Sequence, residues 1–227
     1  MSCENIIIRL RELYDPKNIE GMKKFGITSD NAYGISTPEL KSIANEIGKN
    51  HELALELWNT GIREARIIAG LIDEPSKVKE EQMDQWVNDF NSWDVCDSIC
   101  MVLFDRTPFV YSKINQWCEA EKEYVKRAGF VLMACLAVHD KKAKDEIFME
   151  FLQKIIKKSD DGRNFVKKAV NWALRQIGKR NFNLNGYAID SANKILAAGS
   201  KSGKWIASDA LRELKNEKIK KRIAGKK

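Results

Sequence analysis

The chain has 227 residues, of which 44% are hydrophobic and 31% are charged, and its formal net charge is +7. This composition indicates a folded globular protein and excludes an intrinsically disordered one. The longest uncharged apolar run, residues 128–139, is too short to span a bilayer, and the N-terminus lacks the pattern of a signal peptide. We therefore expect a cytoplasmic protein that has no membrane partner.

Apolar residues recur at helical spacing along the whole chain, as in "ELALELW" and "EIFMEFLQKII", and no convincing run of alternating strand residues occurs. The sequence therefore predicts an all-α protein of about ten or more helices. Thr37 and Pro38 are typical of a helix start, with Thr37 as the N-cap and Pro38 in the first turn. The other prolines also lie at expected breaks between helices: Pro16, Pro75 and Pro108.

A pattern with a period near 40 residues repeats in the second half of the chain. Each copy begins with an aromatic residue and leads into an apolar face: "YVKRAGFVLMACL" from Tyr124, "FVKKAVNWALRQI" from Phe165 and "WIASDALREL" from Trp205. Residues 62–72 and 92–104 are weaker copies. The period is that of HEAT or armadillo helix pairs, which stack into a curved solenoid with a concave face. We expect residues 1–227 to form one helical-repeat domain of this kind.

The positive charge is concentrated in the later part of the chain. Residues 141–227 hold 23 Lys and Arg against 9 Asp and Glu, a net charge of +14, whereas residues 1–140 hold 16 against 23, a net charge of −7. Such an excess is typical of a surface that contacts phosphate, so we expect a basic concave groove. A solvated lysine-rich surface is the alternative, and we expect residues 215–227 to be a frayed basic tail.

Five cysteines occur at irregular spacing: Cys3, Cys96, Cys100, Cys118 and Cys135. This odd number argues against a disulfide framework and favours a reducing compartment. The two histidines, His51 and His139, are distant in sequence from the paired cysteines at 96 and 100, so we expect no metal site. The chain also lacks a Walker-type glycine loop, a dinucleotide-binding fingerprint and a G-x-S-x-G elbow, and we expect no cofactor.

The stretch "SWDVCDSI", residues 92–99, places Trp93 and Asp97 one helical turn apart on one face. An aspartate beside a tryptophan in this apolar stretch is expected to be partly buried, and a buried carboxylate needs a partner. That partner is either a structural Arg or Lys, such as Arg127, or a cationic ligand or transition state.

The densest mixture of aromatic and basic residues is "KKAVNWALRQIGKRN", residues 167–181. Its helical spacing aligns one stripe: Lys168, Trp172, Arg175 and Lys179. Lys and Arg bind phosphates, while a tryptophan packs on a sugar or base. The alternative is a core tryptophan beside a solvated basic face.

Four stretches together resemble the AlkD-like DNA alkylation repair family, whose glycosylases are built from HEAT-like repeats. The stretches are "YGISTPELKSIA" (33–44), "SWDVCDSI" (92–99), "EYVKRAGFVLM" (123–133) and "FVKKAVNWALRQIGK" (165–179), and they span most of the chain in the family's order. The resemblance implies hydrolysis of the N-glycosidic bond of cationic N3- or N7-alkylated purines in double-stranded DNA, without conventional base flipping.

The resemblance also assigns roles to residues. The catalytic carboxylate falls on Asp97, and the two tryptophans that embrace the lesion's sugar-phosphate fall on Trp93 and Trp172. The cleft arginine falls on Arg127. We expect further DNA contacts around these residues, from Lys126, Lys168, Arg175, Lys179 and Phe25.

The chain departs from the family's pattern at two places. Type members carry an aromatic pair where this chain has Ser92 and Trp93, and they carry a tyrosine in an N-terminal helix. Phe25 is the nearest candidate for that tyrosine and keeps the ring without the hydroxyl, while Tyr33 is a weaker candidate. The AlkD-like group also contains proteins that bind unusual DNA structures without demonstrated excision.

Three functions are therefore open on the sequence. The first is an alkylpurine glycosylase, which we expect to be a monomer and which requires the catalytic and cleft residues on one positive concave face. The second is a non-catalytic DNA-binding module in which Asp97 is only the structural partner of Arg127. The third is a protein-binding scaffold, which predicts weak affinity for DNA.

Overall fold

The structure is a computed structural model that describes residues 1–225. Within them the chain forms fourteen α-helices and one short 3-10 helix, and it forms no strand, which confirms the all-α prediction. The chain divides into two compact units, residues 1–109 and 110–227, with the boundary beside the break predicted at Pro108. That the whole chain forms a single domain stays a prediction.

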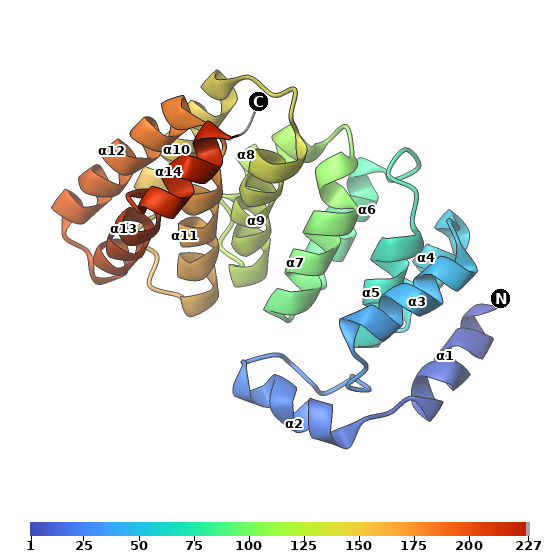
Figure 1. Cartoon of the computed structure of the whole chain (residues 1–227). Coiled ribbons are helices and arrows are strands. Elements are labelled where there is room, and N and C mark those ends of the chain that lie inside the picture. Colours follow the sequence, from blue (N-terminus) through green and yellow to red (C-terminus); the bar gives the residue numbers. More distant parts are fainter. Residues whose placement is uncertain (226–227) are drawn as a thin grey trace. The chain divides into compact units, whose positions relative to one another are not determined.

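The first unit contains these helices in chain order: α1 (Cys3–Glu12), α2 (Pro16–Lys24), α3 (Thr37–Ile47), α4 (His51–Asn59), α5 (Arg63–Ile72), α6 (Glu80–Asn88), α7 (Trp93–Val102) and η1 (Phe104–Arg106). Within this unit α5 packs against α3, α4 and α7 (Figure 1). The indole rings of Trp58 and Trp86 stack in its core with their centroids 3.9 Å apart. The helix α7 therefore packs directly on α5, the most buried helix of this unit.

The second unit contains α8 (Val110–Trp117), α9 (Glu123–His139), α10 (Asp145–Lys157), α11 (Asn164–Gly178), α12 (Phe182–Ala198), α13 (Lys201–Leu214) and α14 (Glu217–Ala224). Figure 1 shows α11 between α9 and α13, and it packs against both. The helices α10 and α12 pack on each other and on α11. This arrangement of helix pairs is that of a helical-repeat protein.

The predicted repeats coincide with helices that lie side by side in the second unit. The copies that begin at Tyr124, Phe165 and Trp205 lie in α9, α11 and α13. The rings of Tyr124 and Phe165 stack with centroids 5.8 Å apart, so equivalent repeat positions contact each other. Gly129 lets α9 approach the end of α8, because a Cβ at this position would lie 2.8 Å from the backbone nitrogen of Cys118.

The structure differs from the sequence-based expectation at two helix ends. Ser36, in extended backbone, is the N-cap of α3, and Thr37 is already helical, so the cap lies one residue earlier than predicted. Residues 217–224 form α14 where a frayed tail was expected. Asn216 caps this helix, and the burial of Ile223 fixes it on its own unit. Residues 226 and 227 of the expected tail lie outside the described residues.

Asp161 ties the loop before α11 to α9. Its carboxylate accepts a hydrogen bond of 2.6 Å from Arg163 and lies 3.5 Å from the Lys126 ammonium. Arg163 also donates to the carbonyl of Glu121 at 2.6 Å. The hydrogen bond from Arg163 outweighs the opposing effect of burial and lowers the pKa of Asp161 to about 2.

This ion pair predicts a pH-dependent contribution to stability. An unfolded aspartate titrates near pH ~3.9, so the pair stabilises the fold above that pH, and the stabilisation is lost as the pH falls through the folded pKa. Allowing for solvent screening, Asp161→Asn should lower the free energy of unfolding by about 1–2 kcal/mol at neutral pH and by about half of that at pH ~3. Urea unfolding at both pH values measures this, and an equal loss at both would contradict it.

Candidate functional site

The residues predicted to act on DNA are distributed over both units. Phe25, Trp93 and Asp97 belong to the first unit. The others belong to the second unit: Lys126, Arg127, Lys168, Trp172, Arg175 and Lys179. That the two groups share one basic concave groove stays a prediction.

In the first unit, Trp93 is the first residue of α7 and Asp97 follows one turn later, so both point to the same side of the helix. Both side chains are partly exposed. The Trp93 indole donates a hydrogen bond of 3.1 Å to the backbone carbonyl of Phe25, the C-cap of α2. Phe25 is 74% exposed. The fold therefore brings Phe25, which is 68 residues away in sequence, next to Trp93.

Tyr33, the weaker candidate for the N-terminal aromatic contact, lies elsewhere in the first unit. Its hydroxyl accepts a hydrogen bond of 3.3 Å from Arg11, and its backbone N–H donates to Glu64 at 2.9 Å. A second bond holds the Phe25 segment, because the Thr28 hydroxyl donates to the carbonyl of Asn91 at 2.8 Å. Of the two aromatic residues, Phe25 is thus the one whose segment is hydrogen-bonded to Trp93, the residue predicted to contact the lesion.

A buried ion-pair network holds the first turn of α7. Arg63 on α5 donates to Asp94 at 2.6 Å and to Glu64 at 2.8 Å. The Ser92 hydroxyl donates to the other oxygen of Asp94. Both carboxylates are buried, Glu64 completely, so Asp94 serves as a structural anchor for the helix that carries Trp93.

The partner of Asp94 was missed by the sequence analysis. Arg63 lies 31 residues before Asp94, at the start of a segment recognised only as a weak repeat copy. The only sequence feature that pointed to this pair is its position: Arg63 lies near the start of the weak copy 62–72, and Asp94 lies near the start of the weak copy 92–104. Glu64 also accepts the backbone N–H of Gly34 at 3.0 Å, which extends the network to the loop before α3.

In the second unit, α9 carries two basic residues whose side chains are largely buried. Arg127 is 5% exposed and donates to the backbone carbonyl of Phe165, near the start of α11, at 2.5 Å. Lys126 is 7% exposed and pairs with Asp161. Both residues therefore join neighbouring repeats, and a contact with DNA would use the small part of each side chain that reaches solvent.

The helix α11 carries the predicted aromatic and basic stripe. Trp172 is partly buried, and Lys168, one turn earlier, is exposed. The apolar face of α11 includes Val166, Ala169 and Ala173, which are fully buried between neighbouring helices. Trp172 and Lys168 therefore lie at the border between the core and the surface, where a ring and an ammonium can contact the same ligand.

Arg175 and Lys179, at the end of the stripe, bind the same carboxylate. Glu213 on α13 accepts from Arg175 at 2.6 Å and from Lys179 at 2.6 Å. Burial alone would raise the pKa of Glu213, but the hydrogen bonds from the two cations outweigh it and the pKa is lowered. Glu213 therefore stays ionised near neutral pH. It partly neutralises the positive charge of Arg175 and Lys179, which the sequence predicts to contact DNA.

Glu213→Gln tests whether these two cations can contact DNA. The substitution should release both cations from the charge of Glu213, while Arg175 keeps Asp209 at 3.6 Å. Binding to duplex DNA should then strengthen and its salt dependence should steepen by about 1–2 in slope, since each newly neutralised phosphate adds ~0.9. Fluorescence anisotropy across a salt series measures this.

Glu217→Gln is the matched control for Glu213→Gln, because Glu217 also pairs with a lysine, Lys220 at 2.8 Å, but is exposed on α14. Both substitutions remove one negative charge from the second unit. Equal slopes for the two variants would show that Arg175 and Lys179 are structural.

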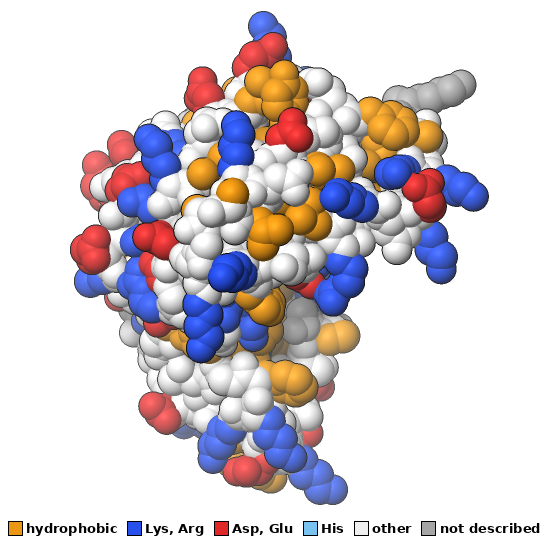
Figure 2. All heavy atoms as spheres, turned by 90° about the vertical axis from the view of Figure 1, so that its left-hand side faces the viewer, with side chains coloured by type: hydrophobic (Ala, Val, Ile, Leu, Met, Phe, Trp, Pro, Cys, Tyr) orange, Lys and Arg blue, Asp and Glu red, His pale blue; other side chains and the backbone are white. Residues whose placement is uncertain are grey.

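Charges of both signs cover the face drawn in Figure 2, where lysine and arginine side chains are interspersed with acidic ones and with hydrophobic groups.

Within residues 1–225, no group of three or more His, Cys, Asp and Glu side chains is arranged to hold a metal ion. None of the described helices is long and apolar enough to cross a membrane.

A sequence profile of the family described as DNA alkylation repair enzymes matches residues 6–214. The chain belongs to the DNA alkylation repair enzyme family. The chain is also similar to an uncharacterised protein from Listeria innocua, with 24% identity over 134 residues. The match covers 57% of this chain and 60% of that relative, so it spans well under the full length of either protein.

A solved structure shares the fold of this family member. Its protein is described as "a new family of proteins related to the HEAT-like repeat DNA glycosylases with affinity for branched DNA structures". The two chains superpose with a TM-score of 0.77 at 21% identity, over 86% of this chain and 83% of the other. The similarity confirms the predicted HEAT-like helical-repeat fold.

Proposed function

We propose that this protein is a DNA glycosylase that hydrolyses the N-glycosidic bond of cationic N3- or N7-alkylated purines in double-stranded DNA. One observation carries the proposal. In a member of the DNA alkylation repair enzyme family, a partly exposed carboxylate, Asp97, lies one turn after a partly exposed tryptophan, Trp93, on a helix anchored by buried ion pairs.

The chemistry suits this pair of residues. An N3- or N7-alkylated purine is already cationic and is a good leaving group, so little general acid catalysis is needed. Breaking the bond leaves positive charge on the deoxyribose, which a fixed carboxylate stabilises while it orients the attacking water. The face of an indole ring carries negative quadrupole density and attracts the same charge. We assign the first role to Asp97 and the second to Trp93.

The second unit supplies DNA contacts in this proposal. Trp172 packs against the sugar-phosphate of the lesion, and Lys168, one turn away, pairs with a phosphate. Arg127 and Lys126 contribute through their exposed ends, while Arg175 and Lys179 contact phosphate only in exchange for Glu213. Phe25 lies beside Trp93 and takes the place of an aromatic contact from the N-terminal segment.

A second candidate function is binding of DNA without excision. It is favoured by the structural neighbour, which is described as having affinity for branched DNA structures. It is also favoured by Ser92, because a serine here contributes to anchoring Asp94 and leaves a single tryptophan at the start of α7. In this function Asp97 would be needed for the fold and would have no chemical role.

Release of free base separates the two functions. Duplex DNA that has been methylated in bulk is incubated with the protein, and free 7-methylguanine and 3-methyladenine are measured by chromatography. The glycosylase predicts release of both from duplex DNA. Tight binding of branched DNA with no free base supports the binding function, and weak binding with a flat salt dependence supports a protein scaffold.

A further inference from the structure

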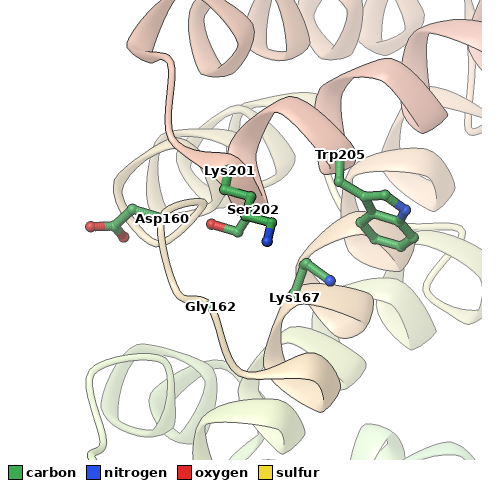
Figure 3. Close-up of a pocket in the computed structure, with 6 residues that line it drawn as sticks. All are labelled: Asp160, Gly162, Lys167, Lys201, Ser202 and Trp205. Carbon is green, nitrogen blue, oxygen red and sulfur yellow. The ribbon is translucent and has the colours of Figure 1, made fainter.

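A cavity of about 380 Å³ opens to solvent in the second unit, between the loop before α11 and the start of α13 (Figure 3). This volume lies in the range of about 300–1,000 Å³ typical of ligand sites. None of its lining residues has a role in the proposed excision: Asp160, Gly162, Lys167, Lys201, Ser202 and Trp205.

The aromatic wall of the cavity is Trp205, a residue that is 42% exposed. At the equivalent positions of the preceding repeats, Tyr124 and Phe165 cover each other by stacking. Trp205 instead has the ammonium of Lys167 over its ring, 4.9 Å from the centroid. A large indole that reaches solvent beside a cation is the pairing that nucleic-acid-binding proteins use to hold a base and a phosphate together.

The remaining walls favour an anionic ligand. Figure 3 shows the Lys167 amine directed at the indole, with Lys201 on the opposite side of the opening and the Asp160 carboxylate directed away. The Ser202 hydroxyl donates to the carbonyl of Ser159 at 2.9 Å, so it belongs to the wall. The cavity therefore presents one aromatic surface and two ammonium groups to a ligand.

We propose that this cavity binds one nucleotide of an unpaired DNA strand, with its base stacked on Trp205 and its phosphate bound by Lys167 and Lys201. A base inside a duplex has both faces covered by its neighbours, whereas an unpaired base exposes a face for stacking. The site goes beyond the proposed excision of alkylated bases and gives the protein a means of holding a branch, gap or loop beside duplex DNA.

Binding of a labelled oligothymidylate tests the proposal. Trp205→Ala should weaken binding roughly tenfold, within the range found for stacking aromatic residues. Lys201→Gln should weaken it severalfold and reduce the salt slope by about 0.7, the value for one phosphate of a single strand. Affinity for fully paired duplex should stay at the wild-type value in both variants.

Two matched controls come from the same unit. Tyr187 is 42% exposed on α12, like Trp205, and Lys204 is exposed on α13 but does not line the cavity. Tyr187→Ala and Lys204→Gln should bind the single strand as wild type does. Equal losses in the variants and the controls, or no loss at Trp205, would overturn the proposal.

Competition and excision assays distinguish the remaining outcomes. If free thymidine monophosphate displaces the strand at equal concentration, the ligand is a free nucleotide and the strand proposal fails. Excision of 7-methylguanine from duplex is measured in parallel with Trp205→Ala. Unchanged excision with weakened single-strand binding supports a separate site, whereas loss of excision in this variant would overturn the separation.

Discussion

Asp97→Asn is expected to reduce the single-turnover rate of 7-methylguanine excision from duplex DNA by about 10²–10³-fold, the usual cost of removing one preorganised electrostatic group. The amide keeps the size of the side chain but loses the negative charge that stabilises the developing sugar cation. Affinity for the methylated duplex should stay near the wild-type value, because the carboxylate acts on charge that appears only in the transition state.

An exposed aspartate of the same unit, Asp30, provides the control, since Asp30→Asn makes the same chemical change at an exposed position of the loop between α2 and α3. It should excise at the wild-type rate. Thermal unfolding of Asp97→Asn gives the second comparison. A variant that excises normally, or that loses activity only because it unfolds, would contradict a chemical role for Asp97.

Arg63→Met is expected to cost about 3–5 kcal/mol in the free energy of unfolding, the range for breaking a buried ion pair by removing one partner. Arg63 is the cation shared by Glu64 and Asp94, and both carboxylates are buried. Methionine fills a similar volume, so the loss reflects uncompensated charge rather than a cavity. Urea unfolding measures it.

The double variant Arg63→Met/Asp94→Asn removes one of the two stranded charges. It should recover part of the stability, because asparagine can still accept the hydrogen bond from Ser92. A double variant less stable than Arg63→Met would show that the ion pair is not the main interaction lost. Excision by both variants should be slower than by the wild-type protein, because the first turn of α7 then lacks its link to Arg63 on α5.

The repeats could be predicted because their signal is local in sequence. The apolar spacing after Tyr124, Phe165 and Trp205 marked helices that proved to be α9, α11 and α13, packed side by side. Adjacent Thr37 and Pro38 likewise marked the start of α3, although the cap proved to be Ser36. Helical period and proline placement depend only on neighbouring residues, so one chain reveals them.

The partners of charged residues could not be predicted in the same way. Glu213 lies 38 residues after Arg175, and the repeat pattern does not mark it as the acceptor for two cations. The ion pair of Arg63 with Asp94 is similarly long in sequence. Apolar packing tolerates many residue choices, whereas an ion pair depends on the register of two helices, which a single sequence does not state.

The C-terminal segment, residues 215–225, shows why net charge alone did not predict its structure. Its lysines indicated fraying, yet Ile219 and Ile223 are spaced one turn apart and Ile223 is buried, so a short amphipathic helix forms. Net charge is a weak guide to the order of a segment when a few apolar residues can reach a core. The exposed Trp205 is the converse case, an aromatic residue at a core-like repeat position that reaches solvent.

The proposed glycosylase activity is tested most directly with a duplex that contains one N7-methylguanine at a defined position. The wild-type protein is incubated with it, and alkaline cleavage reports an abasic site at that position. Strand cleavage at the lesion, with matching free 7-methylguanine, is the result that an alkylpurine glycosylase predicts. Stable binding of the same duplex without any abasic site would contradict the proposed activity and leave a DNA-binding member of the family.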